Sequence, residues 1–194
     1  MRKSEKPFMV EFSGTPEAGK TTAINAVVNM LERDGYKTII LEESAGKLPV
    51  EIPKGIFDAN LWMHFITQAG VLKATYSQAE IVLIDRGIID SKFYAWKFFH
   101  ENEASVKEYE YFKKTCLSEV NPDLLLGLIV SPSTALKRRG AEGKIVKEEY
   151  IKKYNKYFCD FFNDTTLRKS LIRTDELQIS EMNELIYKII SDAL

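Results

Sequence analysis

The sequence predicts an α/β fold in three layers (α/β/α), in which helices cover both faces of a parallel sheet. Short apolar runs alternate with segments of helical apolar spacing over the 194 residues. The runs are continuously apolar, as in residues 81–84 (IVLI). Strands that are buried on both faces read this way, whereas a sheet with one wet face alternates apolar and polar residues. Because no repeat or linker divides the chain, we expect a single domain over residues 1–194.

The N-terminal half is expected to hold three strands and two helices. Gly35 follows the first helical segment, at the position where a left-handed turn closes many helices. The glycines and prolines between residues 46 and 55 discourage regular structure. The expected elements are a strand at 8–12, a helix at 22–34, a strand at 38–41, a helix at 58–78 and a strand at 81–84.

The C-terminal half continues the alternation. A turn at Asn121-Pro122 separates two aromatic-rich helical segments from the fourth strand. Pro132 suits the first turn of a short helix, and Ser180 suits the N-cap of the closing helix. The expected elements are helices at 88–101 and 105–119, a strand at 123–130, helices at 132–139 and 147–163, a strand at 170–173 and a helix at 180–192.

A glycine-rich loop joins the first strand to the first helix. Residues 14–22 read GTPEAGKTT and match the Walker A pattern G-x-x-x-x-G-K-[ST] in the strand–loop–helix context that the pattern requires. Average residue usage gives such a match by chance about one percent of the time in a chain of this length. We therefore expect ATP or GTP to bind here. The expected binding residues are Gly14, Thr15, Pro16, Glu17, Ala18, Gly19, Lys20, Thr21 and Thr22.

Three side chains near this loop have expected tasks. Lys20 is expected to reach the β- and γ-phosphates, and Thr21 to offer its hydroxyl to Mg²⁺. Asp85 ends the third strand, where a carboxylate would complete the magnesium shell beside Thr21. The alternative for Asp85 is a cap on the helix that follows.

Charged residues also end the second and third strands. Arg86 has a planar guanidinium that suits a phosphate or substrate contact, or else a structural pair with Asp90 or Glu43. Glu42 and Glu43 follow the second strand. Either carboxylate could take the proton of an acceptor hydroxyl, pair with Arg86 or face solvent.

Basic residues and glycines follow the fourth strand. Arg138, Arg139 and Lys144 flank a segment at 140–143 (GAEG). Phosphoryl transfer is catalysed mainly by positioning and by cationic contacts to the transferring group. We expect a lid over about 137–147 that closes over the triphosphate, with Arg139 as the first choice for the cationic contact and Arg138 as the second. The alternative is that these cations only complement the C-terminus of a helix.

The helical segment at 58–78 is where an acceptor pocket would be lined. Trp62 or Phe65 could stack on a base, and Gln68 could bind the edge of that base. The alternative is packing in the core, which is the commoner use of aromatic residues at helical spacing.

Composition and charge exclude several classes of function. A net charge of −1 gives no electrostatic footprint for nucleic acid or an anionic membrane, so we expect neither as a partner. The two cysteines, Cys116 and Cys159, are far apart and do not form a C-x-x-C motif. We therefore expect both to be reduced, as is usual in a cytoplasmic protein. Residues 1–6 are charged and lack the apolar region of a signal peptide. The oligomeric state stays open, a homodimer included.

Three stretches together resemble the P-loop nucleoside and nucleotide kinases, and thymidylate kinases most of all. They are residues 10–22, the segment Asp85-Arg86-Gly87 with Asp90, Ser91 and Tyr94, and residues 122–139. The resemblance implies a five-stranded parallel sheet in the order 2-3-1-4-5, an arginine-bearing lid, and adenine held near residues 173–176. Two features depart from thymidylate kinases. Pro16 replaces an aspartate in the P-loop, and residues 42–46 (EESAG) replace a signature of arginine, glutamate, proline and glycine.

The sequence favours a magnesium- and ATP-dependent kinase that acts on a small molecule, either a nucleoside or a nucleoside monophosphate. A second interpretation is an NTPase switch or regulatory module that hydrolyses nucleotide without a small-molecule acceptor. A third is a structural protein that binds nucleotide without turnover. All three share the P-loop, so an enclosed acceptor pocket beside it would distinguish the kinase.

Overall fold

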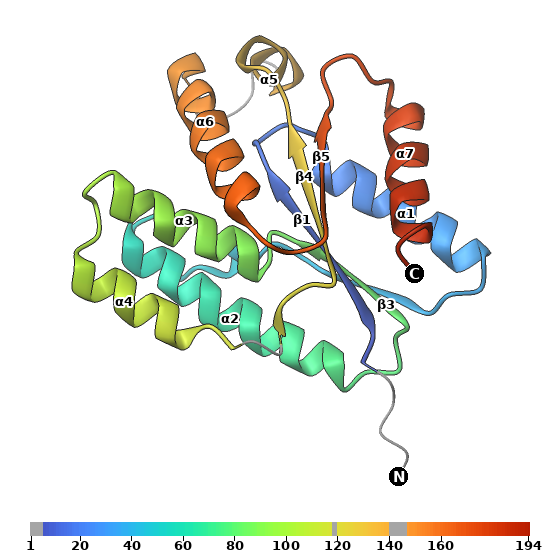
Figure 1. The fold of residues 1–194 in the computed structure, drawn as a ribbon, viewed down its shortest axis with the longest axis horizontal. Helices are drawn as coiled ribbons and strands as arrows, with labels where there is room; N and C mark the ends of the chain where they lie inside the picture. Colours follow the sequence, from blue (N-terminus) through green and yellow to red (C-terminus); the bar gives the residue numbers. More distant parts are fainter. Residues whose placement is uncertain (1–5, 118–119, 140–146) are drawn as a thin grey trace.

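A computed structural model describes residues 6–117, 120–139 and 147–194 of the chain. Its centre is a five-stranded sheet in the order β2-β3-β1-β4-β5, which crosses the middle of the molecule in Figure 1. Neighbouring strands are parallel throughout. The predicted fold class and strand order are confirmed. The strands are β1 (Phe8–Gly14), β2 (Thr38–Leu41), β3 (Ile81–Asp85), β4 (Leu124–Ile129) and β5 (Lys169–Arg173).

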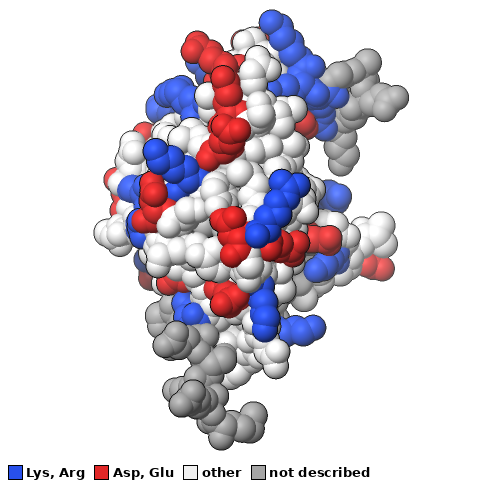
Figure 2. Space-filling view, turned by 90° about the vertical axis from the view of Figure 1, so that its right-hand side faces the viewer, with Lys and Arg blue, Asp and Glu red and all other residues white. Residues whose placement is uncertain are grey.

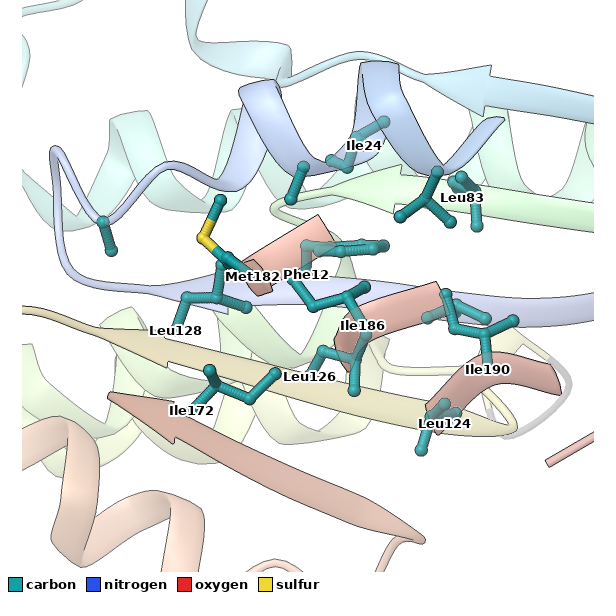
Figure 3. Close-up of a cluster of buried hydrophobic side chains, with 14 of the residues drawn as sticks. Phe12, Ile24, Leu83, Leu124, Leu126, Leu128, Ile172, Met182, Ile186 and Ile190 are labelled. Atoms are coloured by element: carbon teal, nitrogen blue, oxygen red, sulfur yellow. The ribbon is translucent and has the colours of Figure 1, made fainter. Parts of the chain in front are cut away.

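One face of the sheet is covered by α1 (Lys20–Arg33) and α7 (Ile179–Ser191), which lie side by side in Figure 1. Their apolar residues join those of the strands in one buried cluster. Figure 3 shows this cluster around Phe12, Leu126 and Ile186. Burial of such apolar surface stabilises the fold by roughly 25 cal/mol per Å².

The opposite face is covered by α2 (Phe57–Thr75), α3 (Ile88–His100) and α6 (Glu148–Asp164). α4 (Val106–Thr115) packs against α3, while the short helix η1 (Ser44–Lys47) contacts α2 and α5 (Pro132–Arg139) contacts α6. Alternate residues of β1 point to opposite faces of the sheet. Val10 and Phe12 join the α1/α7 cluster, so Glu11 and Ser13 face α3.

Several element boundaries differ from those expected. β1 continues to Gly14, because Ser13 and Gly14 still pair with Gly127 and Leu128 of β4. α4 ends at Thr115, and residues 118–119 lie outside the described part of the chain. The expected cap at Ser180 is wrong, because Gln178 is the N-cap of α7 and forms a capping box with Glu181. The closing turn after α1 is confirmed, with Gly35 at φ +94°.

Acidic and basic side chains are interspersed on the face that Figure 2 shows. This distribution agrees with the net charge of −1. Within the part of the chain that the structure describes, no helix combines the length and apolar character needed to cross a bilayer.

Candidate active site

Two glycines fix the shape of the P-loop between β1 and α1. Gly14 has φ +123°, and a Cβ at this position would lie 2.0 Å from the carbonyl oxygen of Leu128, so a side chain has no room. Gly19 has φ +88° and is the N-cap of α1. Among the described residues no side chain caps this helix, which leaves the N–H groups of its first turn for an anion.

Lys20 begins α1, and its side chain folds back onto the loop. The residue is 6% exposed. Nζ donates to the backbone oxygens of Thr15 at 2.7 Å and Gly14 at 3.2 Å. Burial, and after it the positive charge of Arg86, lowers the pKa of Lys20 to about 7. A polyphosphate beside the ammonium would stabilise its charged form.

The P-loop opens onto a cavity of about 440 Å³, which we name the P-loop cavity. Gly14, Thr15 and Ala18 do not line it. Ala18 is buried in the core, and the Thr15 hydroxyl donates to Asn155 on α6. These three residues therefore shape the loop, whereas the other predicted loop residues face the cavity. The lining residues are Pro16, Glu17, Gly19, Lys20, Thr21, Thr22, Glu43, Asp85, Arg86 and Arg139.

Thr21 and Asp85 place a hydroxyl and a carboxylate together on the wall of this cavity. Thr21 Oγ1 donates to Asp85 Oδ2 at 2.7 Å. Oxygen ligands of this kind fit Mg²⁺, which keeps waters and substrate phosphates as its remaining ligands. The alternative role of Asp85 as a helix cap is wrong, because the first N–H groups of α3 donate to Glu11 instead.

Glu11 is a buried residue beside the site that was not predicted from the sequence. It is 0% exposed and accepts from the N–H groups of Ile89 at 3.0 Å and Asp90 at 2.7 Å. A Cβ on Gly87 would lie 2.4 Å from Glu11 Oε2, so only glycine fits there. Burial raises the pKa of Glu11 to about 7, against the lowering effect of its backbone hydrogen bonds. One acidic residue within the apolar run of β1 was the available signal.

Arg86 turns the chain from β3 into α3 with φ 56°, a left-handed conformation that is uncommon for a residue with a side chain. Its Nε lies 3.2 Å from Glu43 Oε1. One terminal nitrogen donates to both carboxylate oxygens of Asp90, at 3.2 and 3.3 Å, and Ser13 also donates to Asp90. Both structural pairs that were open from the sequence are present, and Arg86 still lines the P-loop cavity.

A second cavity, of about 220 Å³, meets the P-loop cavity at Glu43 and Arg86, which line both. We name it the α2–α3 cavity. It is smaller than the roughly 300–1,000 Å³ of sites for drug-sized ligands. Its other lining residues are Ser44, Ala45, Gly55, Ile56, Asn60, Met63, Thr67, Asp90, Ser91, Tyr94, Phe98 and Tyr150.

The predicted acceptor residues Trp62, Phe65 and Gln68 do not line the α2–α3 cavity. Phe65 is 43% exposed. Gln68 is fixed in place, because its Nε2 lies 2.9 Å from both His64 Nε2 and the Thr115 oxygen, and its Oε1 accepts from the N–H of Leu117. α2 lines this cavity with another face, which carries Asn60, Met63 and Thr67.

The structure distinguishes the two glutamates after β2. Glu43 pairs with Arg86 and lines both cavities. Both glutamates are exposed, but Glu42 lines a different hollow, beside β2 and α2, which shares Arg86 with the two cavities. Burial raises the pKa of Glu43, and the Arg86 charge opposes this shift. Of the two carboxylates, Glu43 is therefore the one that lines both the P-loop cavity and the α2–α3 cavity.

The two arginines of α5 also differ in position. Arg138 donates to Thr174 Oγ1 at 2.9 Å and to the Glu17 oxygen at 3.3 Å, so it ties the end of β5 to the P-loop. Arg139 lines the P-loop cavity. Residues 140–146 of the expected lid, with Lys144, lie outside the described residues.

Comparison with known proteins places this site in a family, although no family model matches the chain. The thymidylate kinase of Mycoplasma capricolum subsp. capricolum is 30% identical over 165 residues, which cover 77% of this chain and 76% of that protein. The chain belongs to the thymidylate kinase-like P-loop nucleoside and nucleotide kinases. The thymidylate kinase of Thermoanaerobacter sp. strain X514 is 23% identical over 172 residues, covering 76% of this chain and 83% of that one.

Solved structures agree on the fold of this kinase. The deoxyadenosine kinase of M. mycoides with bound dCTP superposes with a TM-score of 0.74 at 20% identity, over 95% of this chain and 100% of that chain. The same enzyme with bound dATP gives a TM-score of 0.72 over 95% and 99% of the two chains. The family identifies the chain as a phosphotransferase of the nucleoside and nucleotide kinase type.

Proposed function

We propose that the chain transfers the γ-phosphoryl group of ATP, in the presence of Mg²⁺, to a hydroxyl or phosphate oxygen of a nucleoside or nucleoside monophosphate. The observation that carries this proposal is the junction of the two cavities at Glu43 and Arg86. A donor in the P-loop cavity and an acceptor in the α2–α3 cavity would meet at these two residues. Holding two reactants in this way is a large part of catalysis of phosphoryl transfer.

The donor half of the proposal assigns the triphosphate to the P-loop. The free N–H groups at the start of α1 and the Lys20 ammonium would bind the β- and γ-phosphates. Thr21 and Asp85 would hold Mg²⁺, which would neutralise part of the negative charge of the donor phosphates. Arg86 and Arg139 face the same cavity and would stabilise the transferring group.

The acceptor half assigns the proton transfer to Glu43. An acceptor oxygen attacks the γ-phosphorus and forms the new P–O bond, while the bond from the γ-phosphorus to the β–γ bridging oxygen breaks and ADP leaves. Where the acceptor is a hydroxyl, its proton passes to the Glu43 carboxylate. Partial burial raises the pKa of this carboxylate against the lowering effect of Arg86, which makes it a better base than a glutamate of ordinary pKa.

The proposal is tested by measuring ADP release from ATP and Mg²⁺ with a panel of nucleosides and nucleoside monophosphates. We expect release to depend on an acceptor, and Lys20→Ala to abolish it while far-ultraviolet circular dichroism stays that of the native fold. Release that is equally fast without any acceptor would support the NTPase switch. Absence of any affinity for ATP or GTP would contradict both interpretations.

A further inference from the structure

We propose that the α2–α3 cavity accepts an uncharged molecule of the nucleoside class and disfavours the corresponding monophosphate. This inference rests on the function proposed above and narrows its acceptor. The relatives described above leave the choice between a nucleoside and a nucleoside monophosphate open. The two sequence relatives are named thymidylate kinases, whereas the solved structures are of a deoxyadenosine kinase.

The charges around the cavity carry the inference. Among the described residues that line it, the charged side chains are Glu43, Asp90 and Arg86. Two carboxylates and one guanidinium leave the wall with a net charge of −1. A phosphate monoester adds a further charge of about −1.5 to −2 at neutral pH, so a monophosphate would enter a wall that already has an excess of negative charge.

The Arg86 guanidinium already has two carboxylate partners in the wall of this cavity. Its Nε lies 3.2 Å from Glu43 Oε1, and its terminal nitrogen lies 3.2 and 3.3 Å from the two Asp90 oxygens. A phosphate that approached Arg86 from this cavity would therefore lie beside both carboxylates as well. Like charges that are desolvated together repel strongly, so binding a monophosphate here would carry a penalty that a nucleoside does not meet.

Two lysines near this cavity are also paired. Lys97 and Lys153 line an adjacent cavity, where their ammonium groups lie 2.5 and 2.7 Å from the Glu101 carboxylate. They do not line the α2–α3 cavity. Lys20 and Lys47 line two other hollows that share Arg86 with this cavity. Among the described residues, these four lysines therefore lie outside the wall of the α2–α3 cavity itself.

The remaining wall suits a neutral ring compound with hydroxyl groups. Asn60 Nδ2 donates to the Ser91 oxygen at 3.0 Å, which leaves Asn60 Oδ1 as an acceptor. Ser44 and Thr67 supply hydroxyls 2.9 Å apart. Met63 and Phe98 supply apolar surface against which a planar ring can pack.

The test compares matched pairs of acceptors with the full chain, ATP and Mg²⁺. For each common base, the nucleoside and its 5′-monophosphate are assayed for kcat/KM by acceptor-dependent ADP release. We expect the nucleoside to exceed its monophosphate by about 100-fold or more for the preferred base. A monophosphate that is equal or superior would overturn this inference and leave the proposed kinase function intact. Failure of every nucleoside and monophosphate would overturn the proposed function itself.

Two variants test whether charge is the cause. Asp90→Asn removes one carboxylate from the wall, and we expect it to reduce the preference for the nucleoside by about tenfold. Ser44→Ala changes the same wall without changing its charge, and we expect the preference to stay as in the wild type. An unchanged preference in a folded Asp90→Asn protein would overturn the electrostatic explanation. Should Asp90→Asn fail to fold, the wild-type pairs still decide whether the nucleoside is preferred, and an unchanged preference at high ionic strength would count against the electrostatic explanation.

Discussion

At the scale of the residue, the candidate site depends on how Arg86 and Glu43 are held. Arg86 keeps a left-handed backbone although it carries a long side chain, and its N–H donates to the Phe12 oxygen at 2.9 Å. Such conformations cost of order 1–3 kcal/mol and persist where the surrounding structure fixes them. Here the ion pairs with Glu43 and Asp90 fix the guanidinium between the two cavities.

The identities of these residues were predicted from the sequence, but their arrangement was not. Arg86 had two possible ion-pair partners, and Glu42 and Glu43 were equivalent, because a strand end does not reveal which side chain points to the sheet edge and which to solvent. The loop motif was different. Glycines and a lysine with Walker A spacing, placed between a strand and a helix, indicate a phosphate-binding loop. The P-loop could therefore be assigned without coordinates.

We predict that Glu43→Gln lowers kcat by about 10²- to 10⁴-fold, because an amide cannot take the acceptor proton. Glu42→Gln is the matched control, and we expect it to leave kcat nearly unchanged, since Glu42 lines neither the P-loop cavity nor the α2–α3 cavity. Steady-state kinetics of both variants with the best acceptor is the measurement. Equal losses in the two variants would show that Glu43 has no special role.

At the scale of the element, the site is built where α3 and α6 dock on the end of β1. Glu11 and Ser13 on β1 hold the start of α3. The Tyr154 hydroxyl on α6 donates to the Gly14 oxygen at 3.0 Å. These contacts join segments that are far apart in the sequence, so no local pattern indicates them.

The orientation of α2 shows a second limit of sequence patterns. Apolar residues occur around most of this helix, so its spacing identifies a helix without showing which face meets the site. Trp62 and Phe65 were chosen as large rings, whereas the face toward the cavity carries Asn60 and Thr67. Only the packing of α2 against α3 selects that face.

We predict that Glu11 makes the stability of the fold fall as pH rises from about 4.5 to about 7. The folded-state pKa of Glu11 is about 7, and the ordinary value of 4.5 applies to the unfolded chain, so the folded protein binds the proton more tightly in this window. The stabilisation is fully present below about pH 4.5 and is lost by about pH 7. Its size is of order 3 kcal/mol.

Glu11→Gln removes this titration, and chemical denaturation at several pH values measures the result. We expect the free energy of unfolding of the wild type, relative to that of Glu11→Gln, to decrease by about 3 kcal/mol between pH 4.5 and pH 8. A difference between wild type and Glu11→Gln that is constant with pH would mean that Glu11 titrates normally.

At the scale of the whole molecule, the fold follows from the alternation of apolar strands and helices. The three layers were predicted because strands such as residues 81–84 are apolar on both faces, and the parallel order followed from the family resemblance. In sheets of this kind ligands bind at the carboxyl ends of the strands. The P-loop, Glu43, Asp85 and Arg86 all lie at those ends, which is why residues far apart in the sequence line adjoining cavities.

The most direct test of transfer between these cavities follows the γ-phosphoryl group itself. ATP labelled with ¹⁸O in its γ-phosphoryl group is incubated with the chain, Mg²⁺ and the best acceptor among the nucleosides and nucleoside monophosphates, and the products are analysed by mass spectrometry. We expect the label in the phosphorylated acceptor. Label found only in inorganic phosphate would show that water, and not a bound acceptor, receives the group, and would contradict the proposed kinase function.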